Sequence, residues 1–363
     1  MSRLTGNKGE WSEFYVLLKL LVEQRLYAAD EDLNKIDNIF YIVLAIIAGK
    51  NSFGERNYEL NEKSEDIKIF NPADGTFKTI EKSVIRNKLK SIFKVIKDSD
   101  KTFEIKEAEE LKEQLECSNI KSQSNKKTDI VLRIHDLPTG TQQEMGFSVK
   151  SLVGSDPTLL NAGKTTNFTF EIEGGNINAD EINAIETRTK LLDRIQAIHD
   201  GGGKLRFSSV DNKVFKKNLQ YIDTLMPEMV SEILKIYYAG GNNKVSDIVN
   251  VLKETNPLGN ESRSFNPELY EHNVKDFLAA VALGMMPSTP WDGNTEALGG
   301  YIIVKEDGEI VCYHLFNMNQ FREYLFTNTR LERGDTKRHQ FCKVYCENGK
   351  TFIKLNLQIR FMK

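Results

Sequence analysis

The segment TDIVLRIHDLPTGTQQEMGFSVKSLV, residues 128–153, contains two runs rich in β-forming residues on either side of the turn signal Pro138-Thr139-Gly140. This arrangement predicts an antiparallel β-hairpin. Side chains alternate between the two faces of a strand, so Ser148 and Lys150 share a face of the second strand. A turn centred on residues 138–141 pairs residues whose numbers sum to about 279. The sequence therefore predicts that Asp129 lies opposite Lys150.

A carboxylate and an amine facing each other on two otherwise apolar strands have two interpretations. The first is a simple cross-strand ion pair. The second is a nuclease centre, because the spacing resembles the PD-(D/E)xK core, where an Asp and an acid two residues before a Lys hold Mg²⁺. In this chain the position of that second acid is occupied by Ser148. A neutral hydroxyl is a poor Mg²⁺ ligand compared with a carboxylate, so another acid is needed.

The chemistry of phosphodiester cleavage explains why such a centre combines carboxylates with a lysine. The reaction places negative charge on the phosphoryl oxygens and on the leaving oxygen. A hard cation bound by carboxylates supplies Lewis acidity and a more acidic water. A lysine orients or deprotonates that water and screens the developing charge.

The rest of the chain alternates helical and β-rich patterns, which predicts an α/β (α+β) fold with a mixed sheet flanked by helices. Residues 1–255 are expected to form the nuclease core with helical elaborations, and residues 256–363 a β-rich, basic region that recognises DNA. The apolar periodicity and turn signals predict helices at 10–24, 33–50, 80–97, 104–117, 179–199, 213–238, 245–254 and 266–283, and further strands at 167–173, 300–304, 309–315, 341–345 and 351–361. Residues 51–79 are expected to be polar and irregular.

Composition limits the class of protein and its partners. No apolar run reaches the roughly 18 residues of a membrane span, and four cysteines in 363 residues make no disulfide framework, so we expect a cytoplasmic protein without a membrane partner. The chain has a formal charge of −3. Residues 322–363 contain ten Lys/Arg against four acids, a net of +6, which leaves −9 for residues 1–321. This asymmetry indicates a polyanionic partner, and the alternative is a solvated tail that happens to be basic.

Longer strings of sequence add a resemblance to a known family. Together they resemble the HpaII family of type II restriction endonucleases, and they occur in order from about residue 7 to residue 361. The strings are NKGEWSE at 7–13, LYAAD at 26–30, TDIVL at 128–132, GFSVKS at 146–151, TLLNA at 158–162, TNF at 166–168 and KLNLQIRF at 354–361.

The resemblance implies a PD-(D/E)xK restriction-endonuclease-like fold and Mg²⁺-dependent cleavage of double-stranded DNA at a short site, CCGG for the family's namesake. It also implies a bacterial host protected by a cognate methyltransferase, and a palindromic target suits a homodimer. Carried over by position, Asp129 is the metal-binding aspartate and Lys150 the catalytic lysine, with Ser148 between them. The helix beside the hairpin offers Glu13 to complete the site. The expected metal ligands are Asp129, Val149, Glu13 and Glu10.

Two segments are candidates for holding DNA. The polar stretch after Lys150 includes Lys164 and Asn167, which suit contacts with phosphates beside the scissile bond. The basic C-terminal region suits the reading of guanines, which calls for Arg or Lys in the major groove. Its candidates are Arg330, Arg333, Lys337, Arg338 and His339.

Other functions stay open at the level of the sequence. With Ser148 in place of an acid, the chain can be a DNA-binding module on a decayed nuclease fold, and a structure-selective repair nuclease is a further alternative. Cys312, His314, Cys342 and Cys346 suggest a zinc site, but they fall on predicted strands rather than in a zinc-binding turn, and free thiols are the preferred interpretation.

Overall fold

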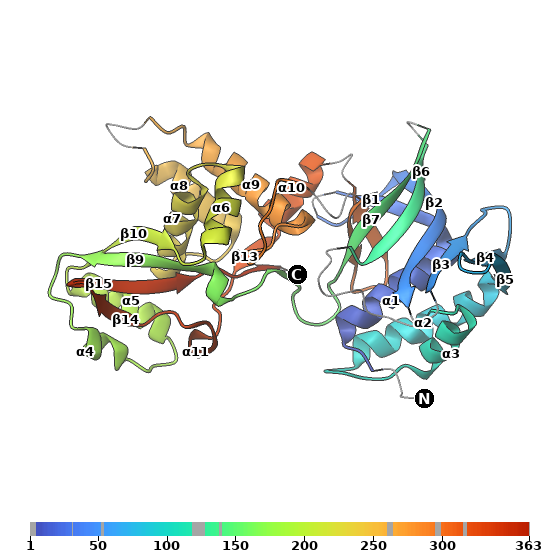
Figure 1. Cartoon of the computed structure of the whole chain (residues 1–363), viewed down its shortest axis with the longest axis horizontal. Helices are drawn as coiled ribbons and strands as arrows, with labels where there is room; N and C mark the ends of the chain where they lie inside the picture. Colours follow the sequence, from blue (N-terminus) through green and yellow to red (C-terminus); the bar gives the residue numbers. More distant parts are fainter. Residues whose placement is uncertain are drawn as a thin grey trace. The chain divides into compact units, whose positions relative to one another are not determined.

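The computed structural model of the chain describes residues 5–30, 32–51, 54–117, 128–137, 140–259, 264–294, 299–314 and 318–362 (Figure 1). The chain forms two compact units. Unit 1 comprises residues 1–157 and 295–321, and unit 2 comprises residues 158–294 and 322–363. Each unit is therefore assembled from two segments that are distant in the sequence.

A nine-stranded mixed sheet is the centre of unit 1. Its strand order is β1-β12-β11-β7-β6-β2-β3-β4-β5, and the hairpin β6–β7 lies in the middle. β7 is antiparallel to β6 and parallel to β11. The strands are β1 (Arg25–Ala29), β2 (Lys35–Asn51), β3 (Gly54–Glu59), β4 (Asp66–Asn71), β5 (Thr76–Glu81), β6 (Ile130–Asp136), β7 (Thr141–Ser151), β11 (Gly300–Val304) and β12 (Ile310–Tyr313).

Strand β2 corrects the expectation of a helix at residues 33–50. The segment is strand along its length and pairs with β1, β6 and β3. A continuous apolar run fits a fully buried strand as well as a buried helix, and periodicity does not separate the two. The β-branched and aromatic residues of Ile39–Val43 favour the strand, because such side chains pack well on a pleated surface.

The expectation of irregular structure at residues 51–79 is also wrong. β3, β4 and β5 form an antiparallel edge of the sheet there. In β4 the apolar Ile67 and Ile69 are buried, while Asp66 and Lys68 between them are exposed. This alternation is the signature of a strand with one face toward the core, and it was hidden among many charged residues.

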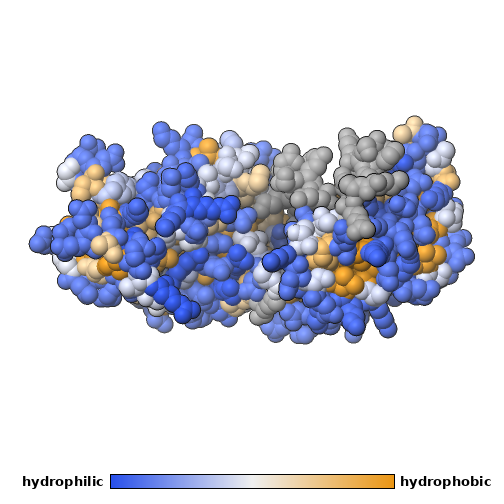
Figure 2. All heavy atoms as spheres, turned by 90° about the horizontal axis from the view of Figure 1, so that it is seen from below, coloured by the Kyte–Doolittle hydropathy of each residue, from blue (hydrophilic) through white to orange (hydrophobic). Residues whose placement is uncertain are grey.

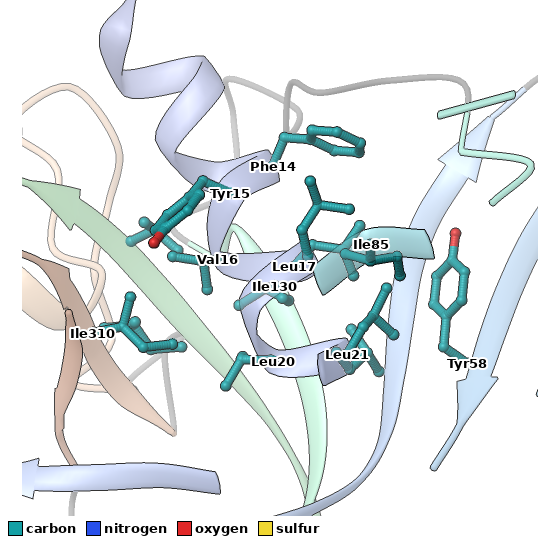
Figure 3. Close-up of a cluster of buried hydrophobic side chains, with 14 of the residues drawn as sticks. Phe14, Tyr15, Val16, Leu17, Leu20, Leu21, Tyr58, Ile85, Ile130 and Ile310 are labelled. Atoms are coloured by element: carbon teal, nitrogen blue, oxygen red, sulfur yellow. The ribbon is translucent and has the colours of Figure 1, made fainter. Parts of the chain in front are cut away.

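Three helices of unit 1 match their predictions within a few residues: α1 (Lys8–Glu23), α2 (Lys82–Asp98) and α3 (Lys106–Gln114). A capping box at Asn7 and Glu10 begins α1. Helix α1 packs against α2 and β7. Its apolar residues join the core of unit 1, where Val16 and Leu20 lie with Ile130 of β6 and Ile310 of β12 (Figure 3). This packing fixes one face of α1 next to the central hairpin.

Unit 2 contains two small sheets and most of the helices. The strand orders are β10-β9-β15-β14 and β13-β16-β8. The strands are β8 (Thr158–Leu160), β9 (Asn167–Glu173), β10 (Lys204–Val210), β13 (Thr329–Leu331), β14 (Val344–Glu347), β15 (Lys350–Asn356) and β16 (Ile359–Phe361). The helices are η1 (Lys164–Thr166, 3₁₀), α4 (Ala179–Asn183), α5 (Lys190–Asp200), α6 (Lys213–Ile222), α7 (Met226–Tyr238), α8 (Val245–Thr255), α9 (Glu268–Leu283) and α11 (Thr336–His339). Helix α10 (Met318–Thr327) contains the boundary between the units at residues 321–322.

The units do not divide the chain at residue 255. Residues 158–294 stay together in unit 2, whereas β11 and β12 belong to the sheet of unit 1. Residues 256–363 are therefore not one β-rich region, because their first strands pair beside the hairpin. Among the described residues, no helix is both long enough and apolar enough to cross a bilayer.

Candidate active site

The register of the central hairpin differs from its prediction by two residues. Ile130 pairs with Phe147 and Asp136 with Thr141, so paired residue numbers sum to 277. The amide of Asp129, which precedes β6, donates to the carbonyl of Phe147 at 2.9 Å. The predicted position of Asp129 opposite Lys150 is therefore wrong, and Asp129 lies beside Ser148 and Val149, which both donate to its carboxylate. A shift of two residues leaves the side chains of the paired strands on their predicted faces.

The carboxylate of Asp129 is held by two donors at one oxygen. The Ser148 hydroxyl donates to Oδ2 at 3.0 Å, and the Val149 backbone amide donates to the same oxygen at 2.7 Å. Ser148 itself is buried, at 2% exposure. Hydrogen bonds to a charged group are stronger than those between neutral groups, so the two donors orient the carboxylate firmly.

Lys150 follows on β7 and is half-buried. Burial lowers the pKa of its amine below the usual value, and the charges of Asp129 and Glu13 act in the opposite direction. Its Nζ lies 5.5 Å from the centroid of the Tyr301 ring. The lysine is therefore next to two carboxylates and an aromatic face, in surroundings that favour its neutral form more than water does.

Helix α1 brings Glu13 to this group. The neighbouring residue, Ser12, is fully buried, its hydroxyl donates to the carbonyl of Lys8 at 2.7 Å, and its oxygen lies 2.8 Å from Ser151 Oγ in a hydrogen bond between the two serines. Ser151 directly follows Lys150, so this contact joins the positions beside the glutamate and the lysine. Glu10 has a different role, because its carboxylate accepts the Asn7 amide at 3.0 Å and completes the cap of α1.

The donor set fits a hard divalent cation that keeps much of its water. Mg²⁺ is commonly bound through one or two carboxylates, with water and substrate phosphates as the other ligands. Asp129 and Glu13 are two carboxylates whose charges both act on Lys150. Across the described ranges, no group of three or more His, Cys, Asp and Glu side chains is arranged to hold a metal. Two carboxylates beside a lysine can hold a divalent cation whose other ligands are water and substrate phosphates.

The two candidates for phosphate contact after Lys150 differ in exposure. Lys164 in η1 is exposed. Asn167 is buried, and its amide nitrogen donates to the carbonyl of His339 at 2.9 Å while its oxygen accepts from Asn356 at 2.7 Å. Asn167 therefore supports the packing of unit 2, and its contact with DNA stays a prediction. The sequence could not reveal this packing, because the partners of Asn167 are about 170 to 190 residues away along the chain.

The basic candidates of the C-terminal segment all lie in unit 2 but in three settings. Arg330 lies in β13 and pairs with Arg360 of β16. Arg333 lies over the ring of Tyr237, with its guanidinium carbon 5.6 Å from the centroid. Lys337, Arg338 and the half-buried His339 belong to the short helix α11, where Lys337 and Arg338 are exposed. The residues are thus distributed over a strand, a loop and a helix.

The four residues considered for zinc are divided between the two units. Cys312 and His314 belong to unit 1, whereas Cys342 and Cys346 belong to unit 2. All four cysteines of the chain are free thiols, and Cys312 and Cys342 are buried. Burial also lowers the pKa of His314 to about 4, which keeps the imidazole neutral. Cys312, His314 and Cys342 are thus buried, whereas Cys346 is exposed.

Tyr301 is a candidate residue that the sequence did not indicate. It lies on β11, opposite Ser148 in the parallel pair β7–β11, and it is 1% exposed. Residues 148 and 301 are far apart in the chain, and only the pairing of β7 with β11 brings them together. An apolar run that reads as a strand, GYIIV at residues 300–304, was the one available signal.

Comparison with known proteins identifies the family of the chain. The family model described as HpaII restriction endonuclease matches residues 7–361. The chain is 39% identical over 360 residues to the type II restriction enzyme HpaII of Haemophilus parainfluenzae, and the match covers 99% of each chain. No solved structure matches the chain. Because both matches extend over nearly its whole length, the chain belongs to the HpaII family of restriction endonucleases.

Proposed function

We propose that this type II restriction endonuclease cleaves double-stranded DNA at CCGG with Mg²⁺, in a PD-(D/E)xK centre made of Asp129, Glu13 and Lys150. Membership of the family supports site-specific cleavage of DNA. The observation that carries the assignment of residues is the shared electrostatic environment. Lys150 is partly desolvated beside Asp129, whose carboxylate is anchored by Ser148, and it also feels the charge of Glu13.

In this proposal Asp129 and Glu13 hold the cation, together with the backbone carbonyl of Val149. Such a cation would supply Lewis acidity at the scissile phosphate and lower the pKa of the attacking water. Ser148 does not replace the missing acid as a ligand. It donates to Oδ2 of Asp129 and thereby orients the carboxylate. Glu10 is the weaker candidate ligand, because the start of α1 already uses its carboxylate.

Lys150 then accepts the proton that the attacking water loses. A lowered pKa increases the fraction of neutral amine at neutral pH, and a neutral amine accepts a proton from the attacking water. The protonated amine, next to the phosphate, balances part of the charge that develops on the phosphoryl oxygens. Tyr301 positions the amine through its ring face and favours the ammonium form that results.

The proposed target and partners are inferred from the similarity to HpaII and not from the residues of the active site. CCGG is proposed because the chain is 39% identical to HpaII over 99% of both chains, and a cognate methyltransferase would protect the host genome. A palindromic target suits two copies of the chain related by two-fold symmetry. We place the enzyme in the bacterial cytoplasm, where the DNA that it cuts is found.

Digestion of plasmid DNA with Mg²⁺ and sequencing of the fragment ends tests the proposal. Discrete fragments that begin or end within CCGG are expected, and methylation of the site should abolish them. Fragments that map to another sequence would correct the target alone. Complete absence of cutting would instead support a DNA-binding module, and nicking confined to flaps or junctions would support a repair nuclease.

A further inference from the structure

A basic cavity belongs to unit 2, whereas the residues proposed for cleavage belong to unit 1. Its volume is about 410 Å³ and it opens to solvent. Two segments that are distant in the sequence form its walls, residues 188–191 at the start of α5 and residues 333–337 at the start of α11. Four cations line it: Arg188, Lys190, Arg333 and Lys337.

Two carboxylates balance only part of this charge. Asp335 lines the cavity, but its carboxylate accepts the backbone amides of Lys337 and Arg338, each at 2.9 Å, as the cap of α11. Glu186 pairs with Lys190 at 2.7 Å. The hydrogen bond from Lys190 lowers the pKa of Glu186, and the charges of Arg194 and Lys337 act in the same direction. Cations of both walls therefore lie close enough to act on one carboxylate.

Buried polar contacts hold the walls to each other. Arg194 of α5 is 2% exposed, and its guanidinium donates to the carbonyls of Asn183 at 2.8 Å and Cys342 at 2.6 Å. The side chain of Asn183 in turn exchanges two hydrogen bonds with the backbone of Val344, at 2.7 and 2.9 Å. The segment that leads to Arg188 is thus tied to the segment that follows α11, and the cations are presented on a rigid support.

The orientation of Arg333 is a further indication that this surface is arranged to bind a ligand. Its guanidinium lies over Tyr237, and its buried Nε has no hydrogen-bond partner among the described residues. Figure 2 shows the side of unit 2 that carries α5 and α11, and this side is mostly hydrophilic. Concentrated positive charge in a concave, polar surface attracts anions, and phosphate oxygens accept charge-assisted hydrogen bonds from Arg and Lys.

We propose that this cavity binds a phosphate group of the DNA backbone and positions the duplex without reading its sequence. The proposal rests on the proposed function, because it takes DNA as the ligand. It adds Arg188 and Lys190 to the DNA-binding residues and assigns Arg333 and Lys337 to phosphate rather than to guanine. Contacts of this kind fix the register of a protein on DNA, whereas base contacts specify the site.

The test compares two double variants that remove the same charge. Arg188→Gln with Lys337→Gln removes two exposed cations of the cavity. Lys213→Gln with Lys217→Gln is the control, since both lysines are exposed on α6, which lies away from α5 and α11 (Figure 1). Binding of a fluorescent duplex is measured by anisotropy without metal, from about 50 to 200 mM salt.

The cavity variant should bind CCGG and unrelated duplexes more weakly by the same factor. Its plot of log affinity against log salt should lose about 1 unit of slope for each phosphate contact removed. The control should keep the slope of the unchanged protein. An unchanged slope in the cavity variant, or a loss restricted to the CCGG duplex, would overturn the proposal.

Lysine acylation identifies the source of the phosphate. The duplex should slow the acylation of Lys190 and Lys337, whereas inorganic phosphate at millimolar concentration should not. Protection by inorganic phosphate alone would assign the cavity to a free phosphate compound and contradict the proposal. Plasmid cleavage with Mg²⁺ is scored separately. If the unchanged protein cuts DNA but the cavity variant keeps its salt slope, only the cavity proposal is refuted. If the cavity variant loses slope but the unchanged protein never cuts DNA, only the nuclease centre is refuted.

Discussion

At the scale of single residues, Ser148 is the feature that separates this centre from its superfamily pattern. The residue stands where an acid is expected, and its hydroxyl donates to Asp129 Oδ2 at 3.0 Å. Its role in our account is to position the aspartate. A residue that acts through a neighbour in this way should affect the affinity for the cation as well as the rate.

Ser148→Ala should therefore raise the Mg²⁺ concentration needed for half-maximal cleavage and slow cleavage at saturating Mg²⁺ by about 10-fold, the equivalent of one hydrogen bond to a charged group. Ser208→Ala, at an exposed position of β10 in unit 2, is the control for a lost hydroxyl. Cleavage rates measured across a Mg²⁺ titration decide the matter. Equal titrations for the two variants would remove Ser148 from the site.

The pKa of Lys150 gives a second test at this scale. Burial lowers this pKa, while Asp129 and, to a smaller extent, Glu13 raise it. Replacing either carboxylate by its amide removes a raising influence, so the pKa falls further. The pH midpoint for acylation of Lys150 should move to lower pH in Glu13→Gln and move further in Asp129→Asn. A midpoint that stays fixed in Glu13→Gln would separate α1 from the active centre.

Stability should depend on the same group with a defined sign. A lysine whose pKa is lowered by folding opposes the folded state wherever the amine is charged, and this cost disappears as the pH rises through the folded pKa toward the unfolded value. Lys150→Met should therefore raise the free energy of unfolding at neutral pH and give a smaller gain above pH 10. Denaturant unfolding at the two pH values measures the difference.

At the scale of elements, the contact between Ser12 of α1 and Ser151 of β7 couples the helix to the hairpin. It joins the positions next to Glu13 and Lys150 at 2.8 Å. Ser12→Ala and Ser151→Ala should each reduce cleavage, and the double variant should be little slower than the slower single variant. This double-mutant cycle should give a coupling free energy of about 1 kcal/mol between the two residues. Fully additive losses of cleavage rate would show that this contact does not fix the position of α1 against β7.

Local patterns predicted much of the element inventory. The hairpin, α1, α2 and β9 followed from periodicity, capping residues and turn signals, because those signals are local in the chain. Strand β2 was missed since a continuous apolar run is equally compatible with a buried helix. The faces of the paired hairpin residues were predictable, whereas the register was not, because the exact turn decides it.

At the scale of the whole molecule, long-range pairing decides what the sequence leaves open. β11 and β12 come from the last fifth of the chain but pair within the sheet of unit 1. Likewise, β15 pairs with β9 in unit 2. Neither pairing leaves a local signal in the sequence. The division of the chain into these two units and the proximity of Tyr301 to Lys150 could therefore not be predicted from the sequence.

Truncation tests this organisation. A fragment of residues 1–255 lacks β11 and β12 and would expose one edge of β7, and it also lacks β15, the partner of β9. The fragment should aggregate or unfold without a cooperative transition, because unpaired strand edges and apolar faces would be exposed. Thermal unfolding followed by circular dichroism checks this. A fragment that unfolds cooperatively with wild-type strand content would contradict the described pairing.

The central claim is that Asp129 and Lys150 perform the cleavage. Single-turnover cleavage of a CCGG duplex in Mg²⁺ by the unchanged enzyme, Asp129→Asn and Lys150→Gln tests it most directly, with DNA binding measured in parallel. We predict that both variants bind the duplex and cut it at least 1,000-fold more slowly, a loss of about 4 kcal/mol in transition-state stabilisation. Cleavage by either variant within about 10-fold of the unchanged rate would contradict the account.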